Sequence, residues 1–370
     1  MPQTPTPTDA HFMARALRLA ERGVYSTRPN PRVGCVLTHH DEVISEGFHH
    51  HAGGPHAERV ALSLAGERAR GATAYVTLEP CCHQGRTPPC TQALIAAGVA
   101  RVVYAVGDPN PQVAGGGVRV LEAAGITVCG DVLANEARAV NRGFWSRHEL
   151  GRPFITLKVG MSLDGKVALS NGDSQWITSA EARADVQRLR ARSCVVLTGS
   201  GTVLADNPRL NVRDPRFDTG PRPPARAVLD THLRTPANAQ ILTGPGVCYL
   251  FTTCTEMRRH APLLEAGACI EVLPTAPAGI DLGALMARLA ALEFNEVMVE
   301  TGPTLAGSLL DAGLVDELMT YLAPVILGHD ARSAFAMRAL SQLQDAARWR
   351  FVEARQVGQD LRLTSVPAPA

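Results

Sequence analysis

The stretch Gly54-Pro55-His56-Ala57-Glu58 decides the fold of the N-terminal half, together with Pro80-Cys81 and, nine positions later, Cys90. Proline is compatible with a first helical turn, so Pro55 is predicted to open a helix that carries His56 and Glu58 in its first turn. Cys81 and Cys90 fall in the approach to the next predicted helix and at its start. Helix N-termini lower thiol pKa values, which favours the thiolates that bind metal ions.

A zinc deaminase needs three protein ligands that leave the fourth position open, and a carboxylate that moves protons without binding the metal. His56, Cys81 and Cys90 are the candidate ligands, Glu58 is the candidate carboxylate, and Pro80 completes the signature His-x-Glu…Pro-Cys. Two plainer interpretations stay open. One is a capping or core histidine with buried cysteines, and the other is a closed structural zinc site with Cys82 or His83 as fourth ligand.

The composition describes a globular chain of two domains. It has 370 residues, of which 45% are hydrophobic and 19% charged, and 36 basic residues against 35 acidic residues give a net charge of +1. This balance gives no electrostatic footprint for nucleic acid or for an anionic membrane. No apolar run is long enough to span a membrane, and the first eight residues do not resemble a secretory signal, so we expect a cytoplasmic protein. The odd number of nine cysteines indicates a reducing compartment with free or metal-bound thiols.

Hydrophobic periodicity predicts alternating strands and helices in both halves, which is typical of α/β layered domains. The pattern restarts near Gly151-Arg152-Pro153, so the predicted domains are 1–150 and 151–370. The first half is predicted to contain helices at 9–22, from 55, at 91–98 and across 134–147, and strands at 33–37, 43–48, 73–78, 101–106 and 126–129. The second half is predicted to contain strands at 154–159, 194–198, 225–230, 247–252, 296–300 and 317–323, and helices at 180–192, 256–266, 281–292 and 303–312. The loop 208–224, rich in Pro, Arg and Asp, is predicted to be functional.

The second half lacks the usual dinucleotide fingerprint. Gly199-Ser200-Gly201 follows a predicted strand, but the third glycine is missing, so we reject it as a Rossmann motif. The segment Glu300–Ser308 is a better candidate, because free backbone N–H groups at a helix start bind pyrophosphate. An ordinary strand–turn–helix is the alternative interpretation of that segment.

Several long strings in the first half resemble one enzyme family, the bifunctional riboflavin-biosynthesis deaminase–reductases. They are Arg28-Pro29-Asn30-Pro31-Arg32-Val33-Gly34-Cys35, Gly54–Glu58, Thr77–Cys81 with Cys90, and Asp108–Gly115. The eight residues between Cys81 and Cys90 replace the two of the general deaminase signature. The family often has serine where this chain has Cys82, which leaves an alternative thiol ligand open.

The resemblance implies a cytidine-deaminase-like α/β/α domain in which His56, Cys81 and Cys90 bind Zn²⁺ and Glu58 donates and accepts protons. The implied substrate is 2,5-diamino-6-(5-phosphoribosylamino)pyrimidin-4-one, which loses its ring amino group as ammonia. Asn30 is a candidate for binding the pyrimidine edge, although a turn-forming role beside two prolines is equally open. His83 and Arg86 are candidates for contact with the phosphate.

In the second half, Lys158–Lys166, Ser174–Thr178, Thr202–Pro208 and Glu300–Leu305 resemble the reductase part of the same family. The implied fold is like dihydrofolate reductase, and the implied reaction is NADPH-dependent reduction of the ribosyl side chain to ribityl. The resemblance places the cofactor against Gly160, Trp176, Thr202, Asp206, Thr231, Gly302, Pro303, Thr304, Leu305, Ala306, Gly307 and Ser308. It places the phosphorylated substrate against Ser174, Arg190, Leu210, Arg213 and Glu300. Lys158 and Asp206 are the candidate catalytic residues of the reductase.

Two other functions compete with this prediction. One is a zinc deaminase for a nucleoside or tRNA base fused to an unrelated reductase, and the other is a non-catalytic zinc-stapled binding protein. The long Cys81–Cys90 spacing and the small net charge argue against a tRNA substrate. The resemblance also implies a homo-oligomer, either a dimer or a tetramer.

Overall fold

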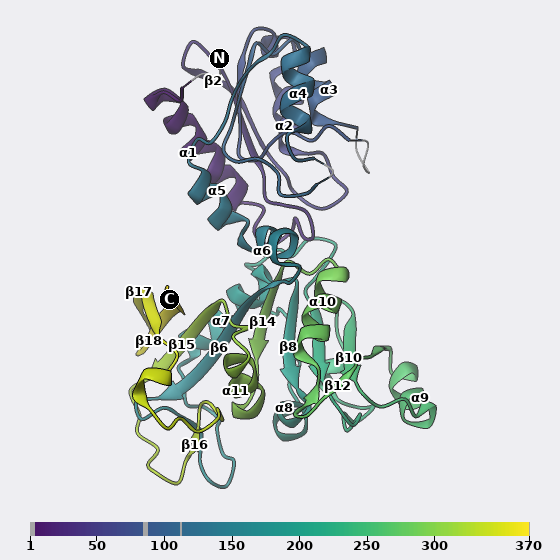
Figure 1. Ribbon diagram of the computed structural model, residues 1–370, viewed down its shortest axis with the longest axis vertical. Coiled ribbons are helices and arrows are strands. Elements are labelled where there is room, and N and C mark those ends of the chain that lie inside the picture. Colours follow the sequence, from purple (N-terminus) through teal and green to yellow (C-terminus); the bar gives the residue numbers. More distant parts are fainter. Residues whose placement is uncertain (1–3, 84–87, 112, 370) are drawn as a thin grey trace. The chain divides into compact units, whose positions relative to one another are not determined.

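The computed structural model describes residues 4–83, 88–111 and 113–369. The chain divides into two compact units, Met1–Gly151 and Arg152–Ala370, and each is described by itself (Figure 1). Among the described residues, we find no helix whose length and apolar character would suffice to cross a bilayer.

Unit 1 is built on a five-stranded sheet within the described residues, in the order β2-β1-β3-β4-β5. The first strand is antiparallel to both of its neighbours, and the last three strands run parallel. The strands are β1 (Gly34–His39), β2 (Glu42–Phe48), β3 (Thr73–Val76), β4 (Arg101–Tyr104) and β5 (Thr127–Cys129). The helices are α1 (Pro7–Glu21), α2 (Ala57–Ala65), η1 (Gly66–Ala69), α3 (Cys90–Ala96), α4 (Gly116–Ala123), α5 (Ala134–Val140) and α6 (Arg142–Leu150).

Helices cover both faces of this sheet, so its central strands are buried on both sides. Along β1, Val36 packs into a core with α1 and α5, whereas Cys35 and Leu37 face a second core formed with α2, α3 and α4. This alternation follows from the two-residue period of a strand. The result is the predicted α/β/α layering, and it brings the first turns of α2 and α3 together on one face.

The single helix predicted across 134–147 is wrong, because the structure has two helices that meet at Asn141. The Asn141 side chain accepts a hydrogen bond from the backbone N–H of Arg32 at 2.7 Å and donates one to its carbonyl oxygen at 2.8 Å. The point between the two helices is therefore hydrogen-bonded to a residue 109 positions away, and no local sequence pattern predicts this contact.

Unit 2 contains a nine-stranded sheet within the described residues, in the order β11-β10-β9-β8-β14-β6-β15-β18-β17. Its strands are β6 (Phe154–Ser162), β8 (Val195–Gly199), β9 (Ala225–Leu229), β10 (Cys248–Thr252), β11 (Ala268–Val272), β14 (Glu296–Glu300), β15 (Glu317–Ala323), β17 (Trp349–Val357) and β18 (Asp360–Pro367). Short strands outside the sheet are β7 (Lys166–Ala168), β12 (Thr275–Ala276), β13 (Gly279–Ile280) and β16 (Arg332–Ser333). The helices are α7 (Ala180–Arg192), α8 (Ser200–Asp206), η2 (Gln240–Leu242), α9 (Met257–Glu265), α10 (Leu282–Ala291), α11 (Pro303–Asp311) and η3 (Leu343–Asp345).

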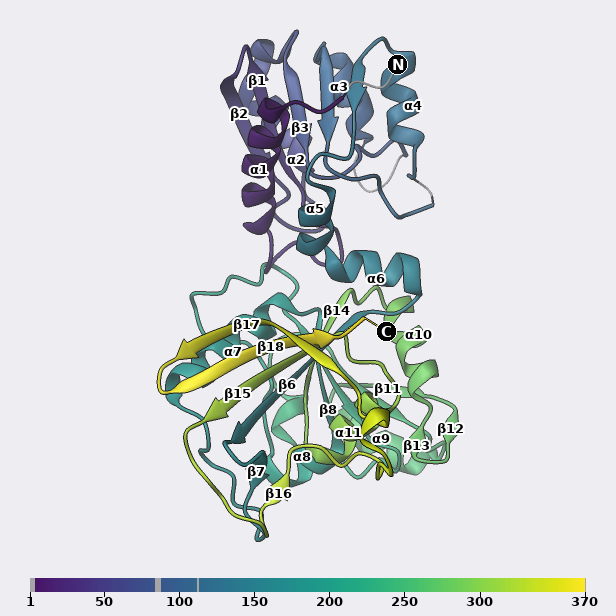
Figure 2. The same ribbon diagram turned by 60° about the vertical axis from the view of Figure 1, so that its left-hand side comes forward.

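Helices α10 and α11 pack on one face of this sheet, and α7 and α9 pack on the other. The hairpin β17–β18 lies beside β15 and pairs with it antiparallel, as Figure 2 shows. The sequence pattern did not predict this hairpin, because most side chains of β17 are exposed and give no hydrophobic alternation. The loop 208–224 contains no helix or strand, as predicted.

Candidate active sites

The three candidate metal ligands of unit 1 meet at the starts of two helices. His56 is the N-cap of α2, Cys90 is the first residue of α3, and Cys81 lies in the segment before it. His56 Nδ1 lies 3.6 Å from Cys81 Sγ and 3.3 Å from Cys90 Sγ, and the three ligand atoms lie within 4.8 Å of one another. When a nitrogen and a sulfur atom bind the same tetrahedral zinc ion, with bonds of about 2.0 Å and about 2.3 Å, they lie about 3.5 Å apart. The donor set therefore fits one zinc ion.

A hydrogen bond links the Cys81 and Cys90 side chains. The hydrogen bond with Cys90 lowers the pKa of Cys81 to about 4, and the same bond raises the pKa of Cys90. The hydrogen bond with Cys81 also raises the pKa of His56. A divalent cation would stabilise both thiolates at once, because a coordinating thiol is deprotonated.

A closed structural site would need Cys82 or His83 as its fourth ligand. The cluster of potential ligands in the described part of the chain contains His56, Cys81 and Cys90 and neither of these two residues. The Cys82 sulfur lies against Gly116, where an added Cβ would approach it to 2.7 Å. Arg86, the other candidate for phosphate contact, lies outside the described residues.

Glu58 lies in the first turn of α2 and is 3% exposed. Burial raises the pKa of this carboxyl group, and the nearby Cys81 thiolate raises it further. A carboxylate with a raised pKa accepts a proton more readily, which suits a residue that must take up a proton and release it again. The position of Glu58 beside the candidate metal ligands therefore fits general acid–base chemistry.

Asn30 lies beside a buried histidine that the sequence analysis did not single out. Burial lowers the pKa of His49 to about 4, so its imidazole is neutral near pH 7. Its Nδ1 lies 3.0 Å from the Pro55 carbonyl oxygen and must donate to it, so its Nε2 accepts from Asn30 Nδ2 at 3.1 Å. This arrangement fixes the orientation of the Asn30 amide, and the His49 ring makes an edge contact with the His56 ring at 5.3 Å.

Glu79 holds the segment that carries Cys81, and the sequence analysis did not single it out either. Its Oε2 accepts from the backbone N–H groups of Asp108 (3.3 Å) and Gly115 (3.0 Å), and its Oε1 from those of Gly117 (2.9 Å) and Val118 (3.3 Å). Gly117 allows the close approach, because a Cβ there would lie 2.1 Å from the Pro80 carbonyl oxygen. The loop before α4 and the first turn of α4 therefore bind directly to Glu79, two residues before the candidate ligand Cys81.

Unit 2 contains a cleft of about 990 Å³ at the carboxyl ends of its parallel strands. Ligands of open α/β sheets bind at this edge. Most of the predicted reductase residues line it, and they come from strands, from helices α7 and α8, from the start of α11 and from loops. These residues are Lys158, Gly160, Ser174, Trp176, Arg190, Thr202, Asp206, Leu210, Arg213, Thr231, Glu300, Gly302, Pro303, Thr304, Leu305 and Ser308.

Ala306 and Gly307 do not belong to the cleft, so the prediction of an unbroken run from 302 to 308 needs correction. Ala306 is 1% exposed and packs in the hydrophobic core. A Cβ on Gly307 would lie 2.1 Å from the Ala336 carbonyl oxygen. Both residues lie on the side of α11 away from the cleft, because successive residues of a helix project in different directions from its axis.

A charged cluster forms one wall of the cleft. Arg190 binds both carboxylate oxygens of Glu300, at 2.5 and 3.0 Å, and Lys158 Nζ lies 3.7 Å from the same carboxylate. Burial lowers the pKa of Lys158. Burial acts to raise the pKa of Glu300, but Arg190 and Lys158 outweigh it and lower that pKa. A lysine with a lowered pKa loses its proton more easily than usual, so it is suited to proton transfer.

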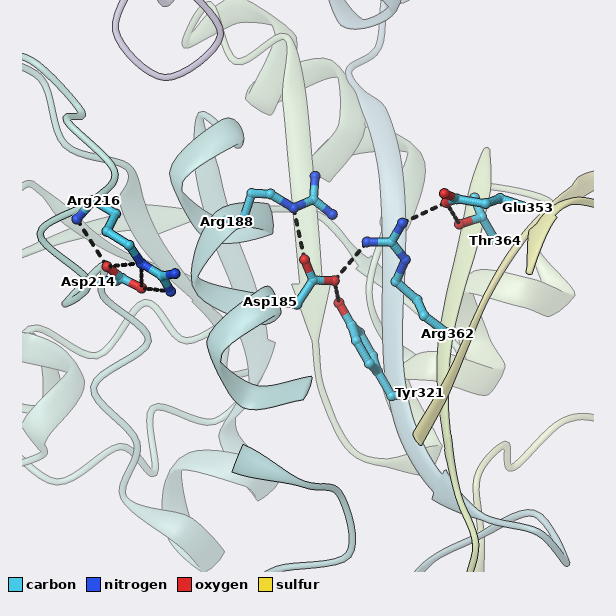
Figure 3. Close-up of polar contacts among 8 residues, drawn as sticks. All are labelled: Asp185, Arg188, Asp214, Arg216, Tyr321, Glu353, Arg362 and Thr364. Carbon is cyan, nitrogen blue, oxygen red and sulfur yellow. Dashed lines mark hydrogen bonds and ion pairs between the residues drawn. The ribbon is translucent and has the colours of Figure 1, made fainter. Parts of the chain in front are cut away.

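Helix α7 is fixed to the sheet by a buried network around Asp185, shown in Figure 3. Its carboxylate accepts from Tyr321 Oη of β15 at 2.6 Å, from Arg362 Nη1 of β18 at 2.7 Å and from Arg188 Nε at 2.9 Å. Arg362 also pairs with Glu353 of β17 at 2.6 Å. This network places the cleft-lining side chains of α7, among them two that the sequence analysis missed, Arg183 and Gln187.

Comparisons with known proteins identify the family of each unit. Residues 6–106 match the family of the cytidine and deoxycytidylate deaminase zinc-binding region, and residues 153–363 match the RibD C-terminal domain. The chain is 48% identical to the riboflavin biosynthesis protein RibD of Escherichia coli K12, which it matches over 97% of its own length and 100% of the relative's. Among solved structures it is similar to Acinetobacter baumannii RibD, with a TM-score of 0.91, 42% identity and coverage of 98% and 99% of the two chains. A Thermotoga maritima diaminohydroxyphosphoribosylaminopyrimidine deaminase/5-amino-6-(5-phosphoribosylamino)uracil reductase has a TM-score of 0.85 and 32% identity over 98% of this chain and 99% of its own.

Proposed function

Because this chain belongs to the RibD family and is a bifunctional deaminase and reductase of riboflavin biosynthesis, we propose specific substrates, cofactors and catalytic residues for its two units. Unit 1 deaminates 2,5-diamino-6-(5-phosphoribosylamino)pyrimidin-4-one, and unit 2 reduces the ribosyl group of the resulting uracil to ribityl with NADPH. The name of the Thermotoga maritima relative supports these substrates. The observation that carries the proposal is the cluster of His56, Cys81 and Cys90 with Glu58 beside it.

In the deaminase, His56, Cys81 and Cys90 hold Zn²⁺, which supplies an activated water when it is bound. Glu58 would take one proton from the attacking water and pass it to the ring nitrogen. It would then take the second proton, from the hydroxyl that this water leaves on the ring carbon, and pass it to the departing amine as the C–N bond breaks. Its burial and raised pKa support this role, because the same group must serve as base and as acid within one turnover. Asn30, whose amide is oriented by His49, offers its carbonyl oxygen to the pyrimidine edge.

In the reductase, NADPH lies along Gly160, Trp176, Thr202, Asp206 and Thr231 and at the start of α11. The first residues of α11 (Pro303–Asp311) have backbone N–H groups without helical partners, which suits the cofactor's pyrophosphate. Gly302, Pro303, Thr304, Leu305 and Ser308 line this part of the cleft. The cofactor supplies the hydride.

Hydride addition at the ribosyl carbon breaks its bond to the ring oxygen, and that oxygen then needs a proton. Lys158 donates this proton, supported by its position in the cleft and by its lowered pKa. Asp206, whose pKa is raised by burial, is the second candidate for positioning the sugar. Ser174, Arg190, Leu210, Arg213 and Glu300 hold the phosphorylated substrate, and the arginine fork suits a phosphate group.

The test uses full-length protein and assays the two half-reactions separately. Glu58→Gln is expected to slow ammonia release by about 10²- to 10⁴-fold and to leave the zinc content and the NADPH oxidation on deaminated substrate unchanged. Lys158→Met is expected to slow NADPH oxidation on deaminated substrate and to leave ammonia release unchanged. The proposal fails if Glu58→Gln releases ammonia at a near-normal rate, or if the metal is not one zinc ion per chain. A cytoplasmic location and a dimer or tetramer remain predictions, and light scattering coupled to size exclusion decides the second.

A further inference from the structure

Gln187 occupies a position in the reductase cleft that neither the sequence analysis nor the proposed function uses. It lies in the middle of α7, one helical turn before Arg190, so both side chains point to the same side of the helix. Gln187 lines the cleft, yet it is only 9% exposed. Two residues earlier, Asp185 fixes α7 to β15 and β18 (Figure 3), so the helix that carries Gln187 is held firmly.

The orientation of the Gln187 amide is determined by one hydrogen bond. Its Oε1 accepts from the backbone N–H of Arg213 at 2.8 Å. An N–H group can only pair with the oxygen of a carboxamide, so Nε2 must be the other end. Within the described part of the chain, Nε2 has no hydrogen-bond partner, so two N–H donors remain for a ligand in the cleft.

The neighbours of Gln187 identify the kind of ligand. Arg190 is already bound by Glu300 through two oxygens, and its Nη1 donates to the Asn211 carbonyl oxygen. Arg213 forms no ion pair with any described residue, and its Nη1 donates only to Asn211 Oδ1, at 3.1 Å. Of the two arginines Arg190 and Arg213, the Arg213 guanidinium is therefore the one that remains available to an anion, and Gln187 adds uncharged donors. Phosphate oxygens accept several such bonds at once.

We propose that Gln187 Nε2 donates a hydrogen bond to the substrate's phosphate group while its Oε1 holds the Arg213 backbone in place. Gln187 thereby distinguishes phosphorylated from unphosphorylated substrate. This inference rests on the proposed function, which places the phosphate near Arg213.

The test measures reductase KM in the full chain with the phosphorylated deaminated substrate and with its dephosphorylated form. Gln187→Glu keeps an oxygen for the Arg213 N–H and replaces the free donors with a carboxylate, so the loop stays anchored. A hydrogen bond to a charged group corresponds to about 10- to 100-fold in affinity. We expect Gln187→Glu to raise KM for the phosphorylated substrate by about this factor. KM for the dephosphorylated substrate, KM for NADPH and the melting temperature are expected to stay within error of the unmodified chain.

A double-mutant cycle distinguishes a direct contact between Gln187 and the phosphate from an indirect effect through Arg213. In an Arg213→Ala background, Gln187→Glu is expected to raise KM for the phosphorylated substrate still further. No further increase, or an equal increase for both substrates, overturns the proposal. If Arg213→Ala alone leaves the preference for the phosphorylated substrate intact, the placement of the phosphate is wrong, and the proposed function fails at that point instead.

Discussion

Replacing Glu79 by Gln tests whether its carboxylate holds Cys81, the proposed metal ligand, in place. In the structure each carboxylate oxygen accepts two backbone N–H groups from the segment 108–118, at 2.9 to 3.3 Å. Glutamine has the same shape but only one acceptor oxygen. Two of the four N–H groups would therefore face an NH₂ group that cannot accept.

The magnitude follows from those two lost bonds. A buried donor without a partner costs about 1 to 3 kcal/mol. One bond of each pair is long, so we expect a total of about 2 to 4 kcal/mol. For a unit of this size that corresponds to a fall of about 4 to 16 °C in melting temperature. Because Glu79 is two residues from Cys81, zinc content and ammonia release should fall together with stability.

Calorimetry, metal analysis and both activity assays on the full chain measure these effects. Reductase activity provides an internal reference, because unit 2 has its own core and cleft. Glu122→Gln, an exposed carboxylate on α4 of the same unit, is the matched control and should change nothing. Unchanged melting and unchanged zinc content in Glu79→Gln would refute the reasoning.

Three further predictions concern single residues. Glu58→Gln should lower the deaminase kcat by about 10²- to 10⁴-fold with zinc retained, and an ammonia assay at matched metal content would contradict this if the rate were near normal. Burial acts against ionisation of Asp9, but hydrogen bonds from Arg101 at 2.6 and 3.0 Å hold the pKa of its carboxyl group at about 2. Relative to the ordinary value of 3.8, this lowered pKa adds about 2 kcal/mol to the free energy of unfolding above pH 4, and that contribution is lost as the pH falls toward 2. Asp9→Asn should remove this part of the pH dependence of stability, measured by urea titrations at several pH values. An unaltered pH profile would contradict the prediction. Burial lowers the pKa of Lys158. If Lys158 is the proposed acid, reductase kcat should fall as the pH rises through that lowered pKa. A residual Lys158→Met activity with the same loss at high pH would assign that loss to another group.

The features that could be predicted from the sequence are those encoded by short-range patterns. The helix predicted at 9–22 is observed at Pro7–Glu21, because the apolar face of Phe12, Met13 and Ala16 is buried against the sheet. The fold class and the bifunctional deaminase–reductase function are confirmed by the comparisons, which favour neither a tRNA deaminase nor a non-catalytic protein.

The features that escaped prediction depend on contacts between distant segments. Asn141 breaks a helix because it binds Arg32, and Glu79 anchors four N–H groups at least 29 positions away. Gln187 looks like any polar residue of an amphipathic helix until the fold brings Arg213 against it. A pattern read along the chain records side-chain type and spacing, but it does not record which loop will come to lie beside a helix.

The backbone hydrogen bonds to Glu79 also bear on how the proposed zinc site would be loaded. The residues before Cys81 are held by N–H groups of the polypeptide, so their placement does not wait for an ion, in contrast to a zinc finger, which is unfolded without its metal. We therefore expect newly made chains to fold first and to load afterwards, releasing protons from the paired thiols as they do so. A strong chelator should strip the centre without melting unit 1, and adding zinc back should restore ammonia release within the time of metal binding, with no refolding lag.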